Sequence, residues 1–385
     1  MDPLDPLGLG EELSTEERLL QEAVRGWVRD RALPRLPGLY ERGEFPPEWA
    51  RELGALGLLG MQLEGYGLPG AGAVAHGLAC LELEAGDSGL RSFVSVQGSL
   101  AMYAIRHYGS EEQRARWLGP MAAGEAIGCF ALTEPDAGSD PAAMRTRAVR
   151  DAGGWRLDGA KMWITNGSRA DVAVVWARAD DGVRGFLVPA DAPGLTTADM
   201  TRKLSFRASI TSELVLDGVR LPDEAVLPGA SGMRAPLSCL TEARYGIVWG
   251  TVGAARACLE AALAYAGSRV QFGRPIAGFQ LTQAKLADMA AAVATSGLLA
   301  LRLARLKDAG RLRPEQVSLG KLNNARSALA VARAARTVLG ANGLTLEYPV
   351  MRHLANLETV LTYEGTHEIH ALVVGRALTG LSAFD

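Results

Sequence analysis

One glutamate near the C-terminus has a setting in which a carboxylate works as a base. Residues 361–380 read LTYEGTHEIHALVVGRALTG, and Glu364 lies at a break between an apolar stretch, 350–361, and a second helix. A carboxylate in an apolar setting at the end of an element can have its pKa raised toward neutrality. Gly365 permits backbone angles that other residues avoid, and Thr366 is a suitable N-cap for the following helix. Glu364 is therefore our candidate catalytic base, and the alternative is a glutamate that merely decorates a helix end.

The composition narrows the class of protein. The chain has 385 residues, of which 48% are hydrophobic and 22% charged, and its formal net charge is -3. This length suits two or three packed units, and the lack of a basic block argues against a nucleic-acid partner. The longest apolar run, 286–306, is interrupted by Asp288, Arg302 and Arg305, so we expect a core helix and no membrane span.

The cysteines and histidines give no sign of a disulfide or a metal site. No two cysteines are close in sequence and no secretory leader precedes them, which predicts buried, reduced thiols in a cytoplasmic protein. They are Cys80, Cys129, Cys239 and Cys258. His367 and His370 lack the carboxylate and histidine partners of a ligand set, so we expect no metal.

The sequence pattern changes twice along the chain, from helical to β and back to helical. A capping box, Ser14 to Glu17, opens a helical pattern that Pro34 ends, and alanine-rich helical sequence continues to about residue 121. From residue 127 short β-branched and aromatic runs alternate with Gly-rich turns, which predicts a compact antiparallel β unit. Long alanine- and leucine-rich segments then predict a helix bundle. These segments are 234–268, 280–308, 314–340 and 350–380.

Five motifs in order resemble those of the acyl-CoA dehydrogenase family of flavoproteins, over essentially the whole chain. They are CFALTEPDAGSD at 129–140, KMWITNG at 161–167, RVQFGRPIAGFQ at 269–280, LGANG at 339–343 and YEGTHEIHALVVGRALTG at 363–380. The resemblance implies a mainly α fold with a central β domain. We expect an N-terminal helical domain at 1–126, a middle antiparallel β-barrel domain at 127–232 and a C-terminal four-helix bundle at 233–385.

The resemblance also implies FAD bound between the β unit and the bundle. Phe130, Leu132 and Thr133 match the segment along the flavin pyrimidine edge, and Ser139 matches a hydroxyl near the pyrophosphate and the acyl chain. Trp163, Ile164 and Thr165 match the strand behind the flavin ring, where a flat aromatic stacks on a flat cofactor. The alternatives are that residues 133–139 form a plain loop and that Trp163 is an ordinary β-core residue. The other motifs of the family argue against both. Thr366 and Glu368 are also assigned to the cofactor site.

A second group of residues matches positions that in this family reach the FAD of a neighbouring subunit. They are Arg269, Phe272, Gln280, Gly340, Ala341 and Asn342, where the family pattern has Gly at the position of Ala341. The forked guanidinium of an arginine suits a pyrophosphate, although Arg269 could equally be an uninvolved surface residue. The match implies a homotetramer.

The implied reaction is the oxidation of an acyl-CoA thioester. Glu364 matches the base that removes a proton beside the thioester carbonyl while hydride leaves to the flavin. The donors at the thioester oxygen are the backbone N–H of Glu364 and the FAD ribityl chain. Arg244 matches a position near CoA, where Thr241 and Glu242 replace amides common in the subgroup, and Gly365 also belongs to the substrate site.

The segment GDSGLRSFVSVQGSL, 86–100, points to the glutaryl-CoA dehydrogenase subgroup. There the arginine at the position of Arg91 binds the distal carboxylate of a dicarboxylic acyl chain, with Ser92 and Tyr363 close by and Glu84 tuning the arginine. The alternative is a surface ion pair of Arg91 with Asp87 or Glu84. The acyl tail of a monocarboxylic substrate binds best in an apolar pocket, and an unpaired cation buried in such a pocket would be energetically costly.

We therefore expect a cytoplasmic, homotetrameric FAD enzyme that converts glutaryl-CoA to crotonyl-CoA and carbon dioxide and passes electrons to an electron-transfer flavoprotein. Some members of the subgroup stop before decarboxylation, and the motifs do not separate the two outcomes. The alternatives are a dehydrogenase for short monocarboxylic acyl-CoA and a catalytically inactive flavoprotein scaffold on the same fold.

Overall fold

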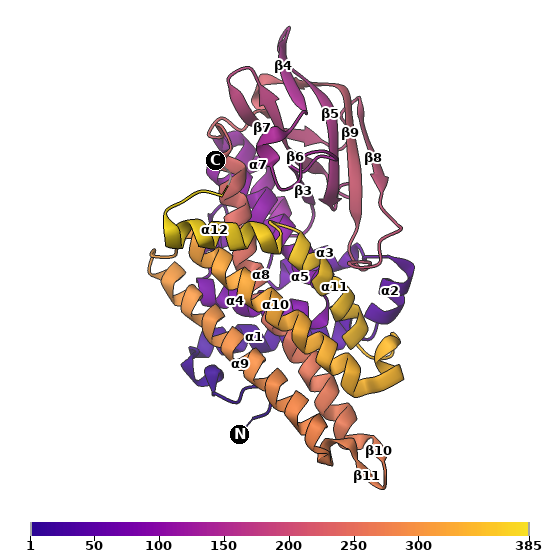
Figure 1. The fold of residues 1–385 in the computed structure, drawn as a ribbon. Coiled ribbons are helices and arrows are strands. Elements are labelled where there is room, and N and C mark those ends of the chain that lie inside the picture. The colour runs from indigo at the N-terminus through magenta and orange to yellow at the C-terminus, as the bar shows by residue number, and fades with distance from the viewer. Residues whose placement is uncertain (1, 384–385) are drawn as a thin grey trace.

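The N-terminal part of the chain is helical. The structure, a computed structural model, describes residues 2–383 and is drawn in Figure 1. The helices of this part are α1 Thr15–Trp27, α2 Leu36–Arg42, α3 Glu48–Ala55, α4 Ala73–Gly86, α5 Ser88–Ser95, α6 Tyr103–Tyr108 and α7 Glu111–Ala122. Turns of π-helix, Val28–Ala32 and Val96–Met102, continue α1 and α5, and the strands β1 Glu64–Gly65 and β2 Leu68–Pro69 form a small hairpin. The predicted capping box opens α1, with the Ser14 hydroxyl and the Glu17 carboxylate accepting from each other's backbone N–H.

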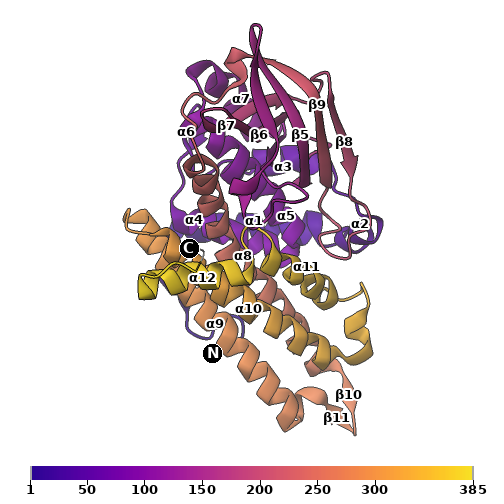
Figure 2. The ribbon, with the colours of Figure 1, turned by 45° about the horizontal axis from the view of Figure 1, so that its top comes forward.

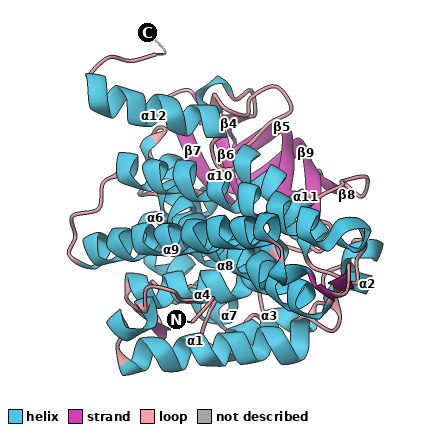
Figure 3. Ribbon diagram, turned by 60° about the horizontal axis from the view of Figure 1, so that its bottom comes forward, coloured by secondary structure: helices cyan, strands magenta, loops and turns pink. Residues whose placement is uncertain are grey.

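The middle of the chain forms one curled seven-stranded sheet. Its strands are β3 Gly128–Ala131, β4 Arg147–Asp151, β5 Gly154–Thr165, β6 Val172–Ala179, β7 Gly182–Pro189, β8 Leu195–Asp199 and β9 Thr211–Pro222. Their order is β3-β6-β4-β5-β9-β8, with β7 paired to β6. Figure 3 shows this sheet gathered on one side of the helices.

The sheet departs from the predicted antiparallel barrel in two ways. β3 and, at one residue pair, β4 run parallel to β6, so the expectation of a wholly antiparallel unit is wrong. Parallel pairing needs a crossover of a dozen or more residues, and residues 132–171 supply it between β3 and β6. Among the described residues, β3 and β8 at the two ends of the strand order do not pair with each other. The sheet is therefore curled but not closed into a barrel.

The C-terminal part is built from long helices. They are α8 Arg234–Ser268, α9 Gln280–Asp308, α10 Pro314–Leu339, α11 Val350–Thr362 and α12 His367–Thr379, with the hairpin β10 Val270–Gln271 and β11 Arg274–Pro275 between α8 and α9. The first three match the predicted segments to within one residue, because alanine and leucine at helical spacing specify both the helix and its buried face. The fourth predicted segment is divided, as expected, at the turn that carries Glu364.

Glycines let α8 lie against α4. A Cβ on Gly250 would stand 2.0 Å from Glu84 Oε2, and one on Gly253 would stand 1.9 Å from the Leu81 carbonyl oxygen. Even a methyl group at either position would therefore force the two helices or their side chains to shift. The packing of the two helices therefore fixes the position of Glu84.

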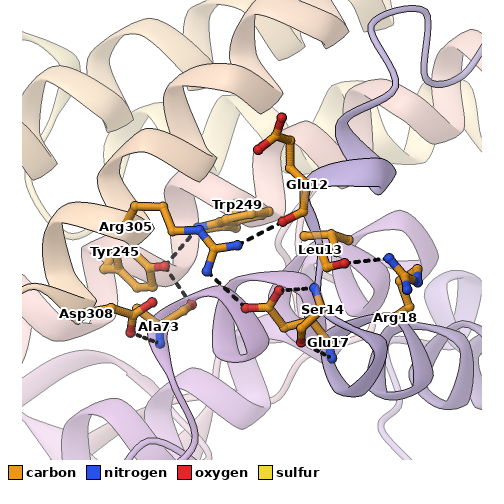
Figure 4. Close-up of polar contacts among 10 residues, drawn as sticks. All are labelled: Glu12, Leu13, Ser14, Glu17, Arg18, Ala73, Tyr245, Trp249, Arg305 and Asp308. Atoms are coloured by element: carbon orange, nitrogen blue, oxygen red, sulfur yellow. Dashed lines mark hydrogen bonds and ion pairs between the residues drawn. The ribbon is translucent and has the colours of Figure 1, made fainter.

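Polar contacts fasten the starts of α1 and α4 to the end of α9 (Figure 4). Arg305 donates to the Glu17 carboxylate at 3.2 Å and to the Glu12 carbonyl at 3.0 Å. The Asp308 carboxylate accepts from the backbone N–H of Ala73 at 2.7 Å. The two helical parts of the chain thus share one framework.

Two helices, α8 and α9, are long and apolar enough to cross a membrane, a criterion that the core helix of a soluble protein also meets. Within this chain 67% of the apolar window of α8 and 44% of that of α9 are buried, so we treat both as bundle helices. All four cysteines are buried and free of disulfides, as predicted.

Candidate active site

Glu364 lies on the turn between α11 and α12, where the bundle meets the sheet close to α5 (Figure 2). α12 begins after Thr366, whose hydroxyl accepts from the backbone N–H of Ile369 at 3.3 Å, so the predicted N-cap is confirmed. Glu364 itself has a positive φ of 50°. Residues other than glycine adopt this conformation at a cost, and it is concentrated at functional sites.

The Glu364 carboxylate is desolvated. Although part of the residue's surface remains accessible, Oε2 is buried without a hydrogen-bond partner. Burial raises the pKa of Glu364, and the positive charges of Arg91, Lys321 and Arg244 oppose this increase without cancelling it. A glutamate that merely decorated a helix end would keep its carboxylate in water.

Arg91 is fully buried and held by an acidic partner. Its Nε donates to Glu84 Oε2 at 2.7 Å, and the Ser88 hydroxyl donates to the other Glu84 oxygen at 2.8 Å. Its Nη2 donates to the Tyr363 hydroxyl, beside the candidate base. Burial alone would lower the pKa of Arg91, but the negative charge of Glu84 raises it above its usual value. The arginine is therefore charged.

The alternative of a surface ion pair between Arg91 and Asp87 is wrong. Asp87 is an extended residue between α4 and α5, so the i, i+4 geometry of a continuous helix does not apply. Its carboxylate instead accepts from the N–H of Gly89 and from Asn356, and it pairs with Arg352.

Among the described residues, two buried donors on α5 lack hydrogen-bond partners. They are Nη1 of Arg91 and the hydroxyl of Ser95. Because the two residues stand four positions apart on one helix, they share a face. Ser92, which was predicted, is buried beside Arg91, whereas Ser95 was not predicted, although its i, i+4 spacing from Arg91 was a usable signal.

The backbone of the Glu364 turn is held by side chains from three helices. Arg244 on α8 donates from Nε to the Glu364 carbonyl at 2.8 Å, and Nε2 of His370 on α12 lies 3.2 Å from the same oxygen. Lys321 on α10 donates to the carbonyls of Gly365, at 2.6 Å, and Tyr363. The family resemblance placed Arg244 near CoA, whereas Lys321 was not predicted, because a single lysine in a helix 43 residues away carries no signal in the sequence.

Trp163 has the setting of a cofactor platform and not of the β-core residue considered as its alternative. It stands where the register between β5 and β9 shifts, with φ 63°, and it is 56% exposed, whereas Ile164 beside it is 2% exposed. Exposing a large indole from a strained backbone is unfavourable unless something covers it. A flat cofactor fits this position, and Thr165 ends the same strand.

The loop after β3 is fastened to β5 by a buried lysine. Nζ of Lys161 donates to the Leu132 carbonyl at 3.0 Å and to Glu134 at 2.8 Å, and the N–H of Met162 donates to the Thr133 carbonyl. The Phe130 and Leu132 side chains face the core, so a contribution of these residues to a cofactor site falls mainly to the main chain. Ser139, further along the loop, and Glu368, in the first turn of α12, are exposed.

The remaining predicted cofactor residues lie far from Trp163 within one chain. Arg269, Phe272 and Gln280 flank or form the β10–β11 hairpin at the opposite end of the molecule from the large sheet (Figure 1), and Phe272 is 95% exposed. Residues 340–342 lie nearby, since Asn342 donates to the Tyr265 hydroxyl at the end of α8. A surface cavity of about 280 Å³ lies here. Its lining is Gln271, Phe272, Ile276, Phe279, Thr282, Lys285, Thr337 and Val338.

The site offers acid–base chemistry at Glu364, cationic recognition at Arg91 and an aromatic platform at Trp163. Within residues 2–383, no three or more His, Cys, Asp or Glu side chains gather as a metal ligand set.

Comparisons with known proteins identify the family of this chain. Three family descriptions match the chain: acyl-CoA dehydrogenase N-terminal domain at residues 14–125, middle domain at 129–219 and C-terminal domain at 230–379. A crystal structure of glutaryl-CoA dehydrogenase from Mycobacterium smegmatis is 66% identical, with a TM-score of 0.97 and 98% of both chains covered. A second glutaryl-CoA dehydrogenase from the same organism, in complex with FADH2, is 59% identical, with a TM-score of 0.98 and coverage of 100% of this chain and 99% of that one. The bovine mitochondrial short-chain specific acyl-CoA dehydrogenase is 36% identical over 94% of this chain and 90% of its own length.

Proposed function

Because this chain belongs to the acyl-CoA dehydrogenase family and oxidises an acyl-CoA thioester with FAD, we propose that its substrate is glutaryl-CoA. The observation that carries the proposal is the buried Arg91, whose Nη1 has no hydrogen-bond partner within residues 2–383, although Glu84 and Tyr363 occupy Nε and Nη2. A buried donor without an acceptor is costly, and a substrate carboxylate would supply the acceptor. Glu84 already balances the charge of Arg91, so the free Nη1 donor, and not the charge of the arginine, is what calls for a substrate carboxylate.

Glu364 is the proposed base. Its raised pKa, caused by burial, brings a carboxylate closer to the acidity needed to take a proton beside a thioester carbonyl. FAD, when bound, accepts the β-hydrogen as hydride. Trp163, Ile164 and Thr165 would hold the flavin ring, because Trp163 offers an exposed flat surface on a rigid strand.

The backbone N–H of Glu364 is a suitable donor to the thioester oxygen. Among the hydrogen bonds of residues 2–383, none takes up this N–H, whereas the carbonyls of Tyr363, Glu364 and Gly365 all have donors. A donor fixed beforehand at the oxygen where charge develops stabilises the transition state without further reorganisation.

Decarboxylation is the proposed second step. Oxidation of glutaryl-CoA gives glutaconyl-CoA, whose distal carboxylate can leave as carbon dioxide while the electrons of the broken bond move into the conjugated thioester. Protonated Glu364 then returns a proton to the dienolate, which gives crotonyl-CoA. The proton first taken from the substrate is thereby returned.

The assembly and the electron acceptor are also proposals. The exposed Phe272 and the apolar cavity beside it lie too far from Trp163 to serve the same flavin, which supports a site completed by a neighbouring copy in a homotetramer. An electron-transfer flavoprotein is the proposed acceptor, and the cytoplasm is the proposed compartment.

Anaerobic mixing of the FAD-loaded protein with glutaryl-CoA or butyryl-CoA tests the proposal. We expect glutaryl-CoA to bleach the flavin absorbance faster and, when an electron acceptor is supplied, to release carbon dioxide. Glu364→Gln should abolish bleaching by both substrates. Preference for butyryl-CoA would instead identify a short-chain monocarboxylic dehydrogenase, bleaching without gas would identify the non-decarboxylating variant, and a yellow protein that no acyl-CoA bleaches would identify a scaffold.

A further inference from the structure

Three consecutive carbonyl groups on the Glu364 turn all point at basic side chains. The carbonyls of Tyr363 and Gly365 accept from one atom, Nζ of Lys321 on α10. The carbonyl between them, that of Glu364, accepts from Nε of Arg244 on α8 and lies within hydrogen-bond distance of Nε2 of His370 on α12. The turn is therefore tied to three helices that are far apart in sequence.

This arrangement accounts for the unusual backbone of Glu364. A residue with a side chain at φ 50° is strained by about 1–3 kcal/mol and stays there only when its surroundings impose the conformation. All three carbonyls have donors, whereas the N–H of Glu364 has no hydrogen-bond partner among residues 2–383. Gly365 follows with φ 90°, and a Cβ there would stand 2.9 Å from His370 Nε2, so the close approach of this donor also needs a glycine.

Lys321 is the residue on which the turn depends most. Its side chain is 2% exposed and its ammonium lies 5.5 Å from the centre of the Tyr363 ring. A lysine is rarely buried unless it is paired, and here its hydrogen bonds go to backbone carbonyls and not to a carboxylate. Within residues 2–383, the hydrogen bonds of this buried ammonium group on α10 therefore go to the turn alone.

We propose that Lys321 is a positioning residue for the reaction, which holds the turn so that the Glu364 carboxylate and the Glu364 N–H both face the substrate. The inference rests on the proposed role of Glu364 as the base and adds a residue that acts on it through the backbone. It assigns Arg244 and His370 to the same clamp, which consists of Lys321, Arg244 and His370.

Removing the charge of Lys321 should change how the rate of flavin reduction depends on pH, because other charged groups surround it. The titratable and charged groups around it are Glu364, Arg244, Arg91 and His370. Burial, Arg244 and Arg91 lower the pKa of Lys321 to about 7, while Glu364 opposes this decrease. In return the cation lowers the pKa of Glu364, so a neutral residue at 321 should shift the base to a higher pKa.

The test compares Lys321→Met with Asn324→Leu in the FAD-loaded protein. Asn324 stands one turn later on α10 and donates to two other buried carbonyls, those of Val248 and Ser296, so its loss also strands two acceptors without touching the turn. We expect Lys321→Met to slow flavin reduction by glutaryl-CoA by about 10²-fold, the cost of a 1 Å misplacement, with the pH profile moved to higher pH. Asn324→Leu should lose similar thermal stability and keep the wild-type pH profile and rate.

A crystal structure gives a readout that needs no activity. In Lys321→Met we expect residue 364 to leave the positive-φ region. If the methionine variant does not fold, the same φ is measured in Lys321→Gln, whose amide group keeps a hydrogen-bond donor at this position. Wild-type φ, rate and pH profile in a folded variant would overturn the proposal. If the wild-type protein is reduced by no acyl-CoA, the role of Glu364 fails, yet the φ of residue 364 still decides whether Lys321 holds the turn.

Discussion

Replacing the buried pair Glu84–Arg91 by neutral residues of similar size should remove the preference for a dicarboxylic substrate without unfolding the protein. Both side chains are 0% exposed, so Arg91→Met alone leaves a buried carboxylate without its partner, which should cost about 3–5 kcal/mol of unfolding free energy. The double variant Glu84→Gln/Arg91→Met removes both charges together. Its stability should return to within about 1–2 kcal/mol of wild type.

The effect on the substrate follows from the lost donor. A hydrogen bond to a charged group contributes about 1.5–3 kcal/mol, so kcat/KM for glutaryl-CoA should fall about 10- to 150-fold in the double variant. Butyryl-CoA has no distal carboxylate and therefore makes no hydrogen bond that the double variant could remove. Its kcat/KM should be unchanged or raised. The assay is steady-state turnover of both substrates with one electron acceptor, alongside urea unfolding.

A second buried carboxylate on α4, which pairs with arginines of other helices, serves as the control. Glu82 on α4 pairs with Arg256 on α8 at 2.6 Å, away from Tyr363. Glu82→Gln/Arg256→Met should change stability while scaling both substrates equally. A folded Glu84→Gln/Arg91→Met protein that still prefers glutaryl-CoA by the wild-type ratio would refute the assignment of Arg91.

Three further outcomes are expected. Gly250→Ala places a methyl 2.0 Å from Glu84 Oε2 and should cost about 1–3 kcal/mol by overpacking; urea unfolding should show no such loss for Gly267→Ala, which has open space on the same helix. Because burial raises the pKa of Glu364, the folded state binds its proton more tightly than the unfolded state, so its contribution to stability is present below the unfolded pKa and is lost as pH rises through the folded pKa. Glu364→Gln should therefore raise the melting temperature relative to wild type at pH 8 but not at pH 4, and an equal difference at both pH values would contradict this sign. Trp163→Gly removes an exposed ring and relieves a positive φ, so the FAD-free protein should keep its melting temperature while FAD binds at least ~10-fold more weakly, measured by fluorescence titration.

The long helices could be predicted from the sequence because their signals are local. Alanine and leucine at helical spacing gave α8, α9 and α10 to within a residue, and Gly365 with Thr366 predicted the break before α12. The motifs that resemble the acyl-CoA dehydrogenase family supplied the order of the three parts. The parallel pairing of β3 with β6 was missed, because strand direction depends on contacts between residues about 40 positions apart.

The site was predictable in its residues and less so in its contacts. Arg91 and its partner Glu84 were both named, but Asp87 was offered as an alternative partner, because the helix break at Asp87 that rules it out was not foreseen. The exposure of Trp163 depends on a register shift between two strands. Lys321 was missed because its role appears only when α10 packs against the Glu364 turn.

The glycines at the α4–α8 contact limit how the acyl specificity of this protein can change. Many enzymes acquire longer substrates when a bulky residue at the end of a pocket is trimmed. Here the residue packed against Glu84 and Arg91 is Gly250, which has no side chain that a substitution could shorten. With Arg91 as the proposed acid-binding residue, a change that lengthens the pocket at this point would remove the ion pair, so acceptance of longer chains and loss of acid recognition would arise together.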